Sequence, residues 1–106
     1  MHVETRNVPD TEGPEGRWEA HADGGTRVAG LARYIRTPDM IAFTHTEVDP
    51  AYEGQGIGSA LVRASLDDAR AQGKKVLPVC PFYAGWIDRH PEYHDLRYTS
   101  RSSVVD

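Results

Sequence analysis

Residues 45–58 read His-Thr-Glu-Val-Asp-Pro-Ala-Tyr-Glu-Gly-Gln-Gly-Ile-Gly, and this stretch decides the fold. It predicts a strand that runs into a loop with three glycines, and a helix that begins directly after the loop. The first amides of a helix lack partners within the helix, and the helix dipole is positive there, so this end attracts anions. Glycines let such a backbone approach a phosphate closely because they carry no Cβ atom.

Two well-known phosphate loops do not fit these glycines. The P-loop needs a Lys followed by Ser or Thr after its last glycine, and no Lys stands at that spacing. The dinucleotide fingerprint G-x-G-x-x-G/A ends on a small residue, whereas this chain has Ser59 or Leu61 there, depending on the first glycine chosen. Two interpretations remain: a loop for another phosphate-bearing ligand, or a turn that only lets strand and helix pack closely.

The overall composition narrows the function classes. The 106 residues support one domain, and a net charge of −4 argues against a nucleic-acid binder, which normally has a basic face. The single cysteine, Cys80, excludes an internal disulfide and fits a reducing compartment. The polar N-terminus does not resemble a signal peptide, and no apolar run has the length of a membrane span, so we expect a cytoplasmic protein.

Alternating polarity predicts four strands before the glycine loop. They are expected at residues 2–8, 17–22, 28–36 and 40–48. A turn-rich connector over residues 9–16 joins the first two strands, and hairpin turns join the others. Residues 28–36 are apolar on both faces, as expected of a central strand.

The remainder of the chain predicts two helices and one further strand. A helix over about residues 56–72 has an apolar face, and Gly73 suits the residue after its end. A short strand over residues 75–79 and a helix from Pro81 to about His90 follow. The predicted order is β-β-β-β-α-β-α, an α/β fold with a mixed sheet, in a domain of residues 1–96. Residues 97–106 are expected to form a polar tail.

This order, together with the loop, resembles the GNAT superfamily of N-acetyltransferases. The acetyl-CoA loop of that superfamily, Gln/Arg-x-x-Gly-x-Gly/Ala, falls on residues 53–58. His45 before the loop, Cys80-Pro81 after the next strand and the segment 90–93 (His-Pro-Glu-Tyr) resemble the small, minimal members of about a hundred residues. The resemblance covers about residues 1–96 and implies a GNAT-like core whose fourth and fifth strands splay apart.

Two features depart from the superfamily pattern. Glu53 stands at the Gln/Arg position of the loop, and a carboxylate near a pyrophosphate is unfavourable unless it points to solvent. Larger members have one or two helices between the first two strands, which cover the acceptor site, whereas this chain has only the connector 9–16. An open acceptor side suits a peptide or protein acceptor, or a site completed by a second subunit.

The resemblance implies an acetyl-CoA-dependent N-acetyltransferase that acts on an unidentified amine of a peptide, a protein or a small molecule. The alternatives are a CoA-binding module with little transferase activity and a small interaction protein that binds no CoA. Acetyl-CoA is the expected cosubstrate, and no nucleic-acid or membrane partner is expected of this monomer or homodimer. No metal is expected, because Pro91 breaks the helical phase between His90 and His94.

The resemblance also implies which residues bind the cosubstrate. The pantetheine arm lies like an extra strand in the splay, where Val48 supplies part of the edge, and loop amides hold the pyrophosphate. Tyr83, one helical turn after Cys80, is a candidate acid for the leaving thiolate or only a packing aromatic. The implied cofactor-binding residues are Val48, Gly54, Gln55, Gly56, Ile57, Gly58, Ser59 and Tyr83.

Three residues are candidates for the chemistry. On an alternating strand, Ile41, Phe43, His45 and Glu47 share one face, which places His45 and Glu47 side by side near the strand end. Either one can take the proton of the amine, or His45 is bonded to a neighbour and Glu47 is solvated. Cys80 is a small buried residue or, if His45 lies opposite, a thiolate nucleophile.

Overall fold

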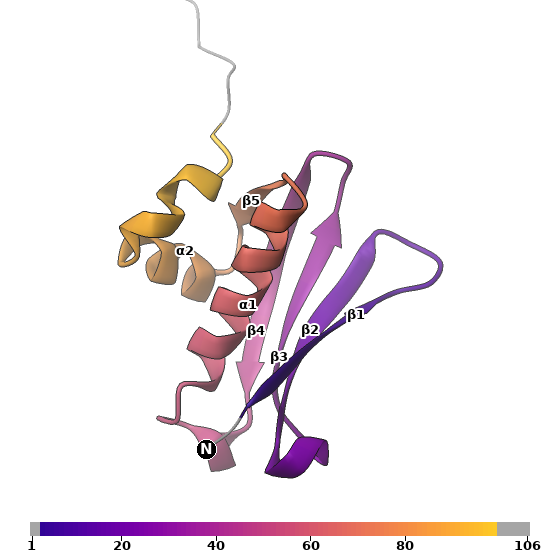
Figure 1. Cartoon of the computed structure of the whole chain (residues 1–106), viewed down its shortest axis with the longest axis vertical. Helices are drawn as coiled ribbons and strands as arrows, with labels where there is room; N and C mark the ends of the chain where they lie inside the picture. Colours follow the sequence, from indigo (N-terminus) through magenta and orange to yellow (C-terminus); the bar gives the residue numbers. More distant parts are fainter. Residues whose placement is uncertain (1–2, 100–106) are drawn as a thin grey trace, which may run out of the picture.

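The computed structural model describes residues 3–99 and contains one five-stranded sheet in the order β1-β2-β3-β4-β5. Strands β1 to β4 are antiparallel, and β5 pairs parallel to β4 (Figure 1). The four strands predicted before the loop and the one predicted after it are confirmed, with ends that differ by at most a few residues. The strands are β1 (Glu4–Pro9), β2 (Glu15–Ala22), β3 (Arg27–Arg36), β4 (Met40–Val48) and β5 (Lys75–Pro78).

Both predicted helices form at the expected places. Helix α1 (Ile57–Ala71) joins β4 to β5, and helix α2 (Pro81–Asp88) follows β5. Gly73 has φ +71°, a left-handed conformation that ends a helix, and the Lys74 amide donates to the Ala69 carbonyl at 3.0 Å. Three 3₁₀ helices complete the described chain: η1 (Asp23–Gly25), η2 (Pro50–Tyr52) and η3 (Pro91–Leu96).

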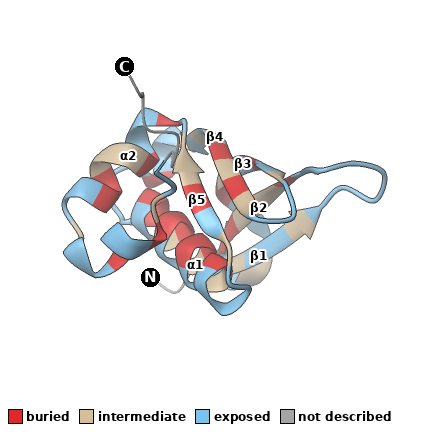
Figure 2. Cartoon of the chain, turned by 90° about the horizontal axis from the view of Figure 1, so that it is seen from above, coloured by how far each residue is buried: buried red, intermediate tan, exposed pale blue. Residues whose placement is uncertain are grey.

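The core lies between the sheet and the two helices, on one side of the sheet (Figure 2). Leu61 and Leu66 of α1 are fully buried there, as is Trp86 of α2. Burying these side chains removes apolar surface from water, which is the main contribution to the stability of such a domain. This side of the sheet is called the covered face below, and the other side the open face.

Strand β3 is the middle strand of the sheet, which confirms the prediction of a central strand. Its apolar side chains are nevertheless not all buried, since Val28 and Ile35 on the open face are 45% and 39% exposed. Only the covered face of β3 has helices packed against it in the described chain. The β1–β2 connection is a short loop around Gly13, so it supplies no helix over that face in the described chain.

The end of the described chain stays attached to the sheet. Arg97 forms an isolated parallel bridge with Val76 of β5, and the Tyr98 amide donates to the Val76 carbonyl at 2.7 Å. Backbone pairing therefore includes Arg97 and Tyr98, the first two residues of the predicted tail. The part of the predicted tail at residues 100–106 lies outside the described residues. Neither α1 nor α2 nor any other described helix has the length and apolarity that crossing a membrane requires.

Gly30 offers a test of the packing between β3 and α1. A Cβ atom at this position would lie 2.8 Å from the Glu47 carbonyl oxygen and 2.9 Å from the Ile57 side chain. We expect Gly30→Ala to lower the free energy of unfolding by about 1–3 kcal/mol, measured by denaturant titration, because the backbone of β4 must move. Gly13→Ala is the matched control, since nothing lies within 4 Å there, and an equal loss in both variants would contradict this packing argument.

Candidate functional site

Strands β4 and β5 part halfway along β4, as the splay prediction requires. Their pairing covers Met40 to Phe43 opposite Lys75 to Pro78. The Cys80 amide then donates to the Phe43 carbonyl at 2.8 Å, and the chain turns into α2. Strand β4 continues to Val48, and within residues 3–99 no strand pairs with that last part on the β5 side. A segment of extended ligand can take the position of a missing strand there.

A β-bulge in β4 decides which side chains face which way. Tyr34 of β3 pairs with Phe43, but the preceding residue, Arg33, pairs with His45, so Thr44 is an extra residue in β4. Paired residues of antiparallel strands project to the same face of a sheet. Phe43 therefore projects with Tyr34 into the core, whereas His45 projects with Arg33 onto the open face.

The bulge overturns one prediction and leaves another intact. The prediction that Ile41, Phe43, His45 and Glu47 share one face was wrong, because the extra residue at Thr44 reverses the alternation. The prediction that His45 and Glu47 lie side by side is confirmed. The His45 Nε2 and Glu47 Oε1 atoms are 2.8 Å apart, and the side chains are 52% and 60% exposed.

Cys80 lies at the point where the strands part, but not beside His45. Its thiol Sγ is 3.4 Å from the Thr46 hydroxyl, and the residue is only 6% exposed. Thr46 pairs with Ala32 of β3, which is buried on the covered face. Cys80 and His45 are therefore on opposite sides of β4, and sequence reasoning missed Thr46 because the bulge is not visible in the alternation.

The structure places Tyr83 in the core instead of at the splay. Its ring is fully buried and stacks on Phe43 with centroids 4.3 Å apart, and its hydroxyl lies 2.7 Å from the Ser65 Oγ. Burial raises the pKa of Tyr83 well above its ordinary value, and the hydrogen bond with Ser65 opposes this only in part. Tyr83 is therefore a packing residue, the alternative that the sequence left open.

The glycine loop takes the form that an anion site needs. Gly54 and Gly56 have φ +76° and +81°, conformations that favour glycine, and no atom lies within 4 Å of a Cβ built on either. The Ala60 amide donates to the Gly56 carbonyl at 3.0 Å, so the amides of residues 57–59 are those that a helix start leaves free. The Gln55 amide differs from the expectation, because it donates to the Tyr52 carbonyl at 3.3 Å.

A hollow at this loop connects it with the free edge of β4. Its walls include Val48, the three loop glycines at 54, 56 and 58, and Phe82 of α2. A Cβ atom on Gly58 would lie 2.7 Å from the Phe82 ring, so only glycine allows this close packing of α1 against Phe82. Glu53 lies at the rim and is exposed to solvent, the arrangement in which its carboxylate interferes least with a phosphate.

Side chains from the β2–β3 hairpin hold the loop in place. The Tyr52 hydroxyl donates to the Asp23 carboxylate at 2.6 Å, across 29 positions of the chain. Arg27 lies 3.7 Å from the Asp49 carboxylate, which also accepts a bond from the Ala51 amide at 2.9 Å. No spacing rule relates these residues, so sequence reasoning missed them. We call Asp23, Arg27, Asp49 and Tyr52 the hairpin clasp.

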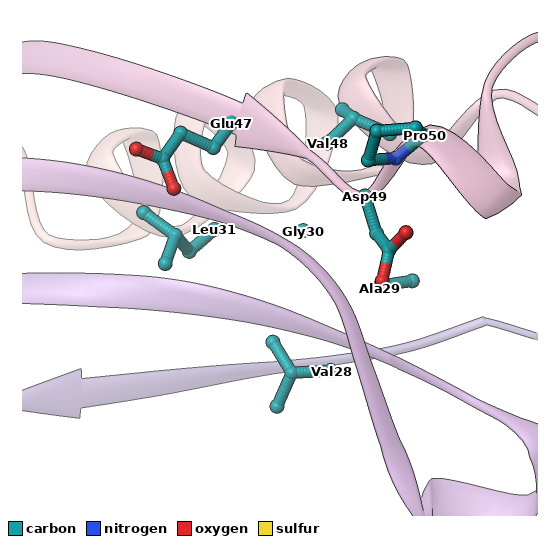
Figure 3. Close-up of a pocket in the computed structure, with 8 residues that line it drawn as sticks. All are labelled: Val28, Ala29, Gly30, Leu31, Glu47, Val48, Asp49 and Pro50. Atoms are coloured by element: carbon teal, nitrogen blue, oxygen red, sulfur yellow. The ribbon is translucent and has the colours of Figure 1, made fainter.

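A second hollow lies on the open face, beside the end of β4 (Figure 3). Residues 28–31 of β3 line one side of it and residues 47–50 line the other. Figure 3 shows the Glu47 carboxylate beside the Leu31 side chain, with Val28 and Asp49 further along. Val48 is the one residue that lines both this hollow and the one at the glycine loop.

A parallel strand pair that splays beside a glycine-rich helix start defines the class of acyl-CoA-dependent N-acyltransferases. The sequence profile of the GCN5-related N-acetyl-transferase family matches residues 17–96 of this chain. The chain belongs to this family, which confirms the resemblance seen in the sequence.

One relative and two solved structures illustrate the similarity in sequence and in fold. The N-alpha-acetyltransferase RimI of Mycobacterium tuberculosis is 47% identical over 60 residues, which are 54% of this chain and 38% of RimI, so the match spans well under half of that relative. A Trypanosoma brucei acetyltransferase has the same fold with a TM-score of 0.65 and 16% identity, covering 99% of both chains. A GCN5-like putative N-acetyltransferase from Staphylococcus aureus gives a TM-score of 0.62 at 20% identity, covering 98% of this chain and 94% of that chain.

The assignment of Tyr83 to the core can be tested with Tyr83→Phe. Loss of the hydroxyl leaves Ser65 without this partner, so we expect the free energy of unfolding to fall by about 1–2 kcal/mol, measured by denaturant titration. The folded state favours the neutral phenol, so the contribution of Tyr83 is complete below pH 10.0, its ordinary pKa, and is lost as the pH rises above that value. Tyr98→Phe, at an exposed position, is the control and is expected to change stability by less than about 0.5 kcal/mol.

Proposed function

We propose that this protein is an acetyl-CoA-dependent N-acetyltransferase that transfers an acetyl group to a primary amine. The observation that carries the proposal is the hollow at the glycine loop, which leads from the free amides of residues 57–59 to the unpaired end of β4. The pyrophosphate of CoA requires an anion-binding site, and its amide-rich pantetheine arm requires an unpaired strand edge. This hollow offers both. Family membership supports the same activity.

The chain offers separate groups for the two parts of the cosubstrate. The backbone at Gly54 and Gly56 and the amides of Ile57, Gly58 and Ser59 face the pyrophosphate, where the positive end of the α1 dipole adds to the attraction. Val48 and the backbone before it bind the pantetheine amides in place of a missing strand. The Gln55 amide, already bonded within the loop, contributes less than the sequence predicts.

The acceptor approaches from the open face. Helices α1 and α2 fill the covered face next to the splay, where Tyr83 and Phe43 stack and Ile57 is buried. The open face carries the exposed pair of His45 and Glu47 at the same position along β4. The bulge at Thr44 therefore brings both candidate bases to the side from which an amine can reach a thioester held in the splay.

The His45–Glu47 pair acts as the base in a direct transfer. An ammonium group gives up its proton to Glu47, which His45 holds by the 2.8 Å contact. The nitrogen lone pair then forms a bond to the acetyl carbon, the carbon–sulfur bond breaks, and its electron pair leaves on sulfur. The nitrogen loses a second proton as the amide forms, and the CoA thiolate takes up that proton. Within residues 3–99 the Cys80 thiol hydrogen-bonds to the Thr46 hydroxyl and to no histidine or carboxylate, so we favour direct transfer over an acetyl-cysteine intermediate.

Two observations favour the alternative of a binding module with little transferase activity. Glu53 replaces the Gln or Arg that the loop pattern predicts. The side chains of His45 and Glu47 are also both more than half exposed to solvent. Water weakens the electrostatic interactions of an exposed catalytic base, and it competes with the acceptor amine for hydrogen bonds to that base. A turnover assay with a range of amines separates the two, since the binding module retains affinity for acetyl-CoA without transfer.

Binding of acetyl-CoA tests the loop directly. We expect Gly56→Glu to raise the Kd for acetyl-CoA, measured by calorimetry, at least about tenfold, or about 1.4 kcal/mol, because it places a carboxylate against the phosphates. Gly73→Glu is a matched control at the other end of α1. It has a similar left-handed conformation, with φ +71° against +81°, and equally open space. Absence of binding by the unchanged protein would falsify the proposal.

Transfer to an amine tests the proposed roles of the side chains. We expect Glu47→Gln and His45→Gln each to lower kcat about 10²-fold or more, because the base is lost or no longer oriented. Cys80→Ala is expected to retain transfer within about threefold, with no acetyl-enzyme detected by mass spectrometry of the unchanged protein. Loss of transfer in Cys80→Ala together with a trapped acetyl-enzyme would establish the covalent route instead.

A further inference from the structure

The open-face hollow combines apolar walls with carboxylates, and the side chains of Val28 and Leu31 in it have no role in the proposed cosubstrate site. Val28 and Leu31 of β3 form its apolar side, and Val28 is 45% exposed, which is unusual for a valine in a central strand. Exposed apolar side chains that gather in a hollow indicate contact with a ligand or partner. The hollow is open to solvent and has a volume of about 420 Å³, enough for a small side chain or a short alkyl chain.

Two carboxylates complete the hollow on the β4 side. Glu47 lies opposite Leu31 in the strand pairing, and Asp49 follows beyond Val48. Asp49 is partly engaged by the Ala51 amide at 2.9 Å and by Arg27 at 3.7 Å, whereas Glu47 contacts only His45 in the described chain. The hollow therefore offers one well-placed negative charge next to an apolar surface.

From this arrangement we infer that the acceptor is a primary alkylammonium, with its charged nitrogen at Glu47 and its carbon chain along Val28 and Leu31. The inference rests on the proposed transferase function and adds the chemical class of the acceptor. Glu47 lies on the part of β4 that has separated from β5, so an amine bound there lies next to the splay. Hydroxyl-rich amines fit less well, because Val28 and Leu31 offer their hydroxyl groups no hydrogen-bond partner.

An amine of this class occurs in several settings, and the hollow is open enough to accept any of them. The nitrogen can be the terminal amine of a peptide whose first side chain is apolar, the end of a lysine side chain, or a free alkylamine. All three place methylene or methyl groups next to a cationic nitrogen. The experiment therefore begins with the shared chemistry and then separates the sources.

The test measures acetyl transfer from acetyl-CoA to ethylamine, butylamine and hexylamine, with glucosamine as a hydroxyl-rich comparison. We expect kcat/KM to rise about two- to fourfold for each added methylene until the hollow is filled, because each methylene leaves water for an apolar surface. Peptides that begin with Leu or Ser, and a lysine derivative with a blocked α-amine, then identify which source is preferred.

A pair of variants on β3 connects the chain-length effect to the hollow. Val28→Thr keeps the shape of the side chain but replaces a methyl group by a hydroxyl, and we expect it to lower the hexylamine-to-ethylamine ratio of kcat/KM about fivefold. Ile35→Thr is the matched control, because Ile35 lies on the open face of the same strand, is 39% exposed and does not line the hollow. We expect Ile35→Thr to leave the ratio unchanged.

The outcomes distinguish this inference from the proposed function. A ratio near one in the unchanged protein, or an equal loss in both variants, overturns the alkylammonium inference while transfer itself stands. Binding of acetyl-CoA without transfer to any of these amines also overturns the inference, and it leaves the cosubstrate site intact. Failure to bind acetyl-CoA removes the proposed function and this inference with it.

Discussion

The hydrogen bond from the Cys80 amide to the Phe43 carbonyl marks the point on which the site depends. Up to this bond β4 and β5 are an ordinary parallel pair, and after it they separate. The separation leaves backbone N–H and C=O groups at the end of β4 without a partner strand on that side, and such groups require other hydrogen-bond partners. Pro81, at the first turn of α2, cannot donate a backbone bond and begins a helix, so β5 cannot extend to cover them.

The two sides of the site are built by different kinds of interaction. The covered face is a packed core, in which α1, α2 and the aromatic stack of Phe43 and Tyr83 fix the strands. The open face is held only by strand pairing and by side-chain contacts along the surface, such as that of His45 with Glu47. Packing on the covered face therefore fixes the geometry of the strands, whereas the proposed base pair of His45 and Glu47 lies on the open face.

Most of the fold was predictable because it follows from local signals. The glycine turn at residues 23–25, the helix end at Gly73 and the apolar face of α1 each depend on residues close together in the chain. The side-chain directions on β4 were not predictable, because the extra residue at Thr44 is defined by its partner strand and not by the sequence around it. For the same reason Thr46, and not His45, is found beside Cys80.

The hairpin clasp has a consequence for how this chain can change over evolutionary time. Surface hairpins usually tolerate insertions and deletions, because a loop adds little entropy cost as it lengthens. The η1 turn is an exception, since Asp23 must stay within reach of Tyr52 and Arg27 within reach of Asp49. The length of the β2–β3 turn is therefore constrained by the loop that follows β4. We expect substitutions, insertions and deletions in these two segments to occur together.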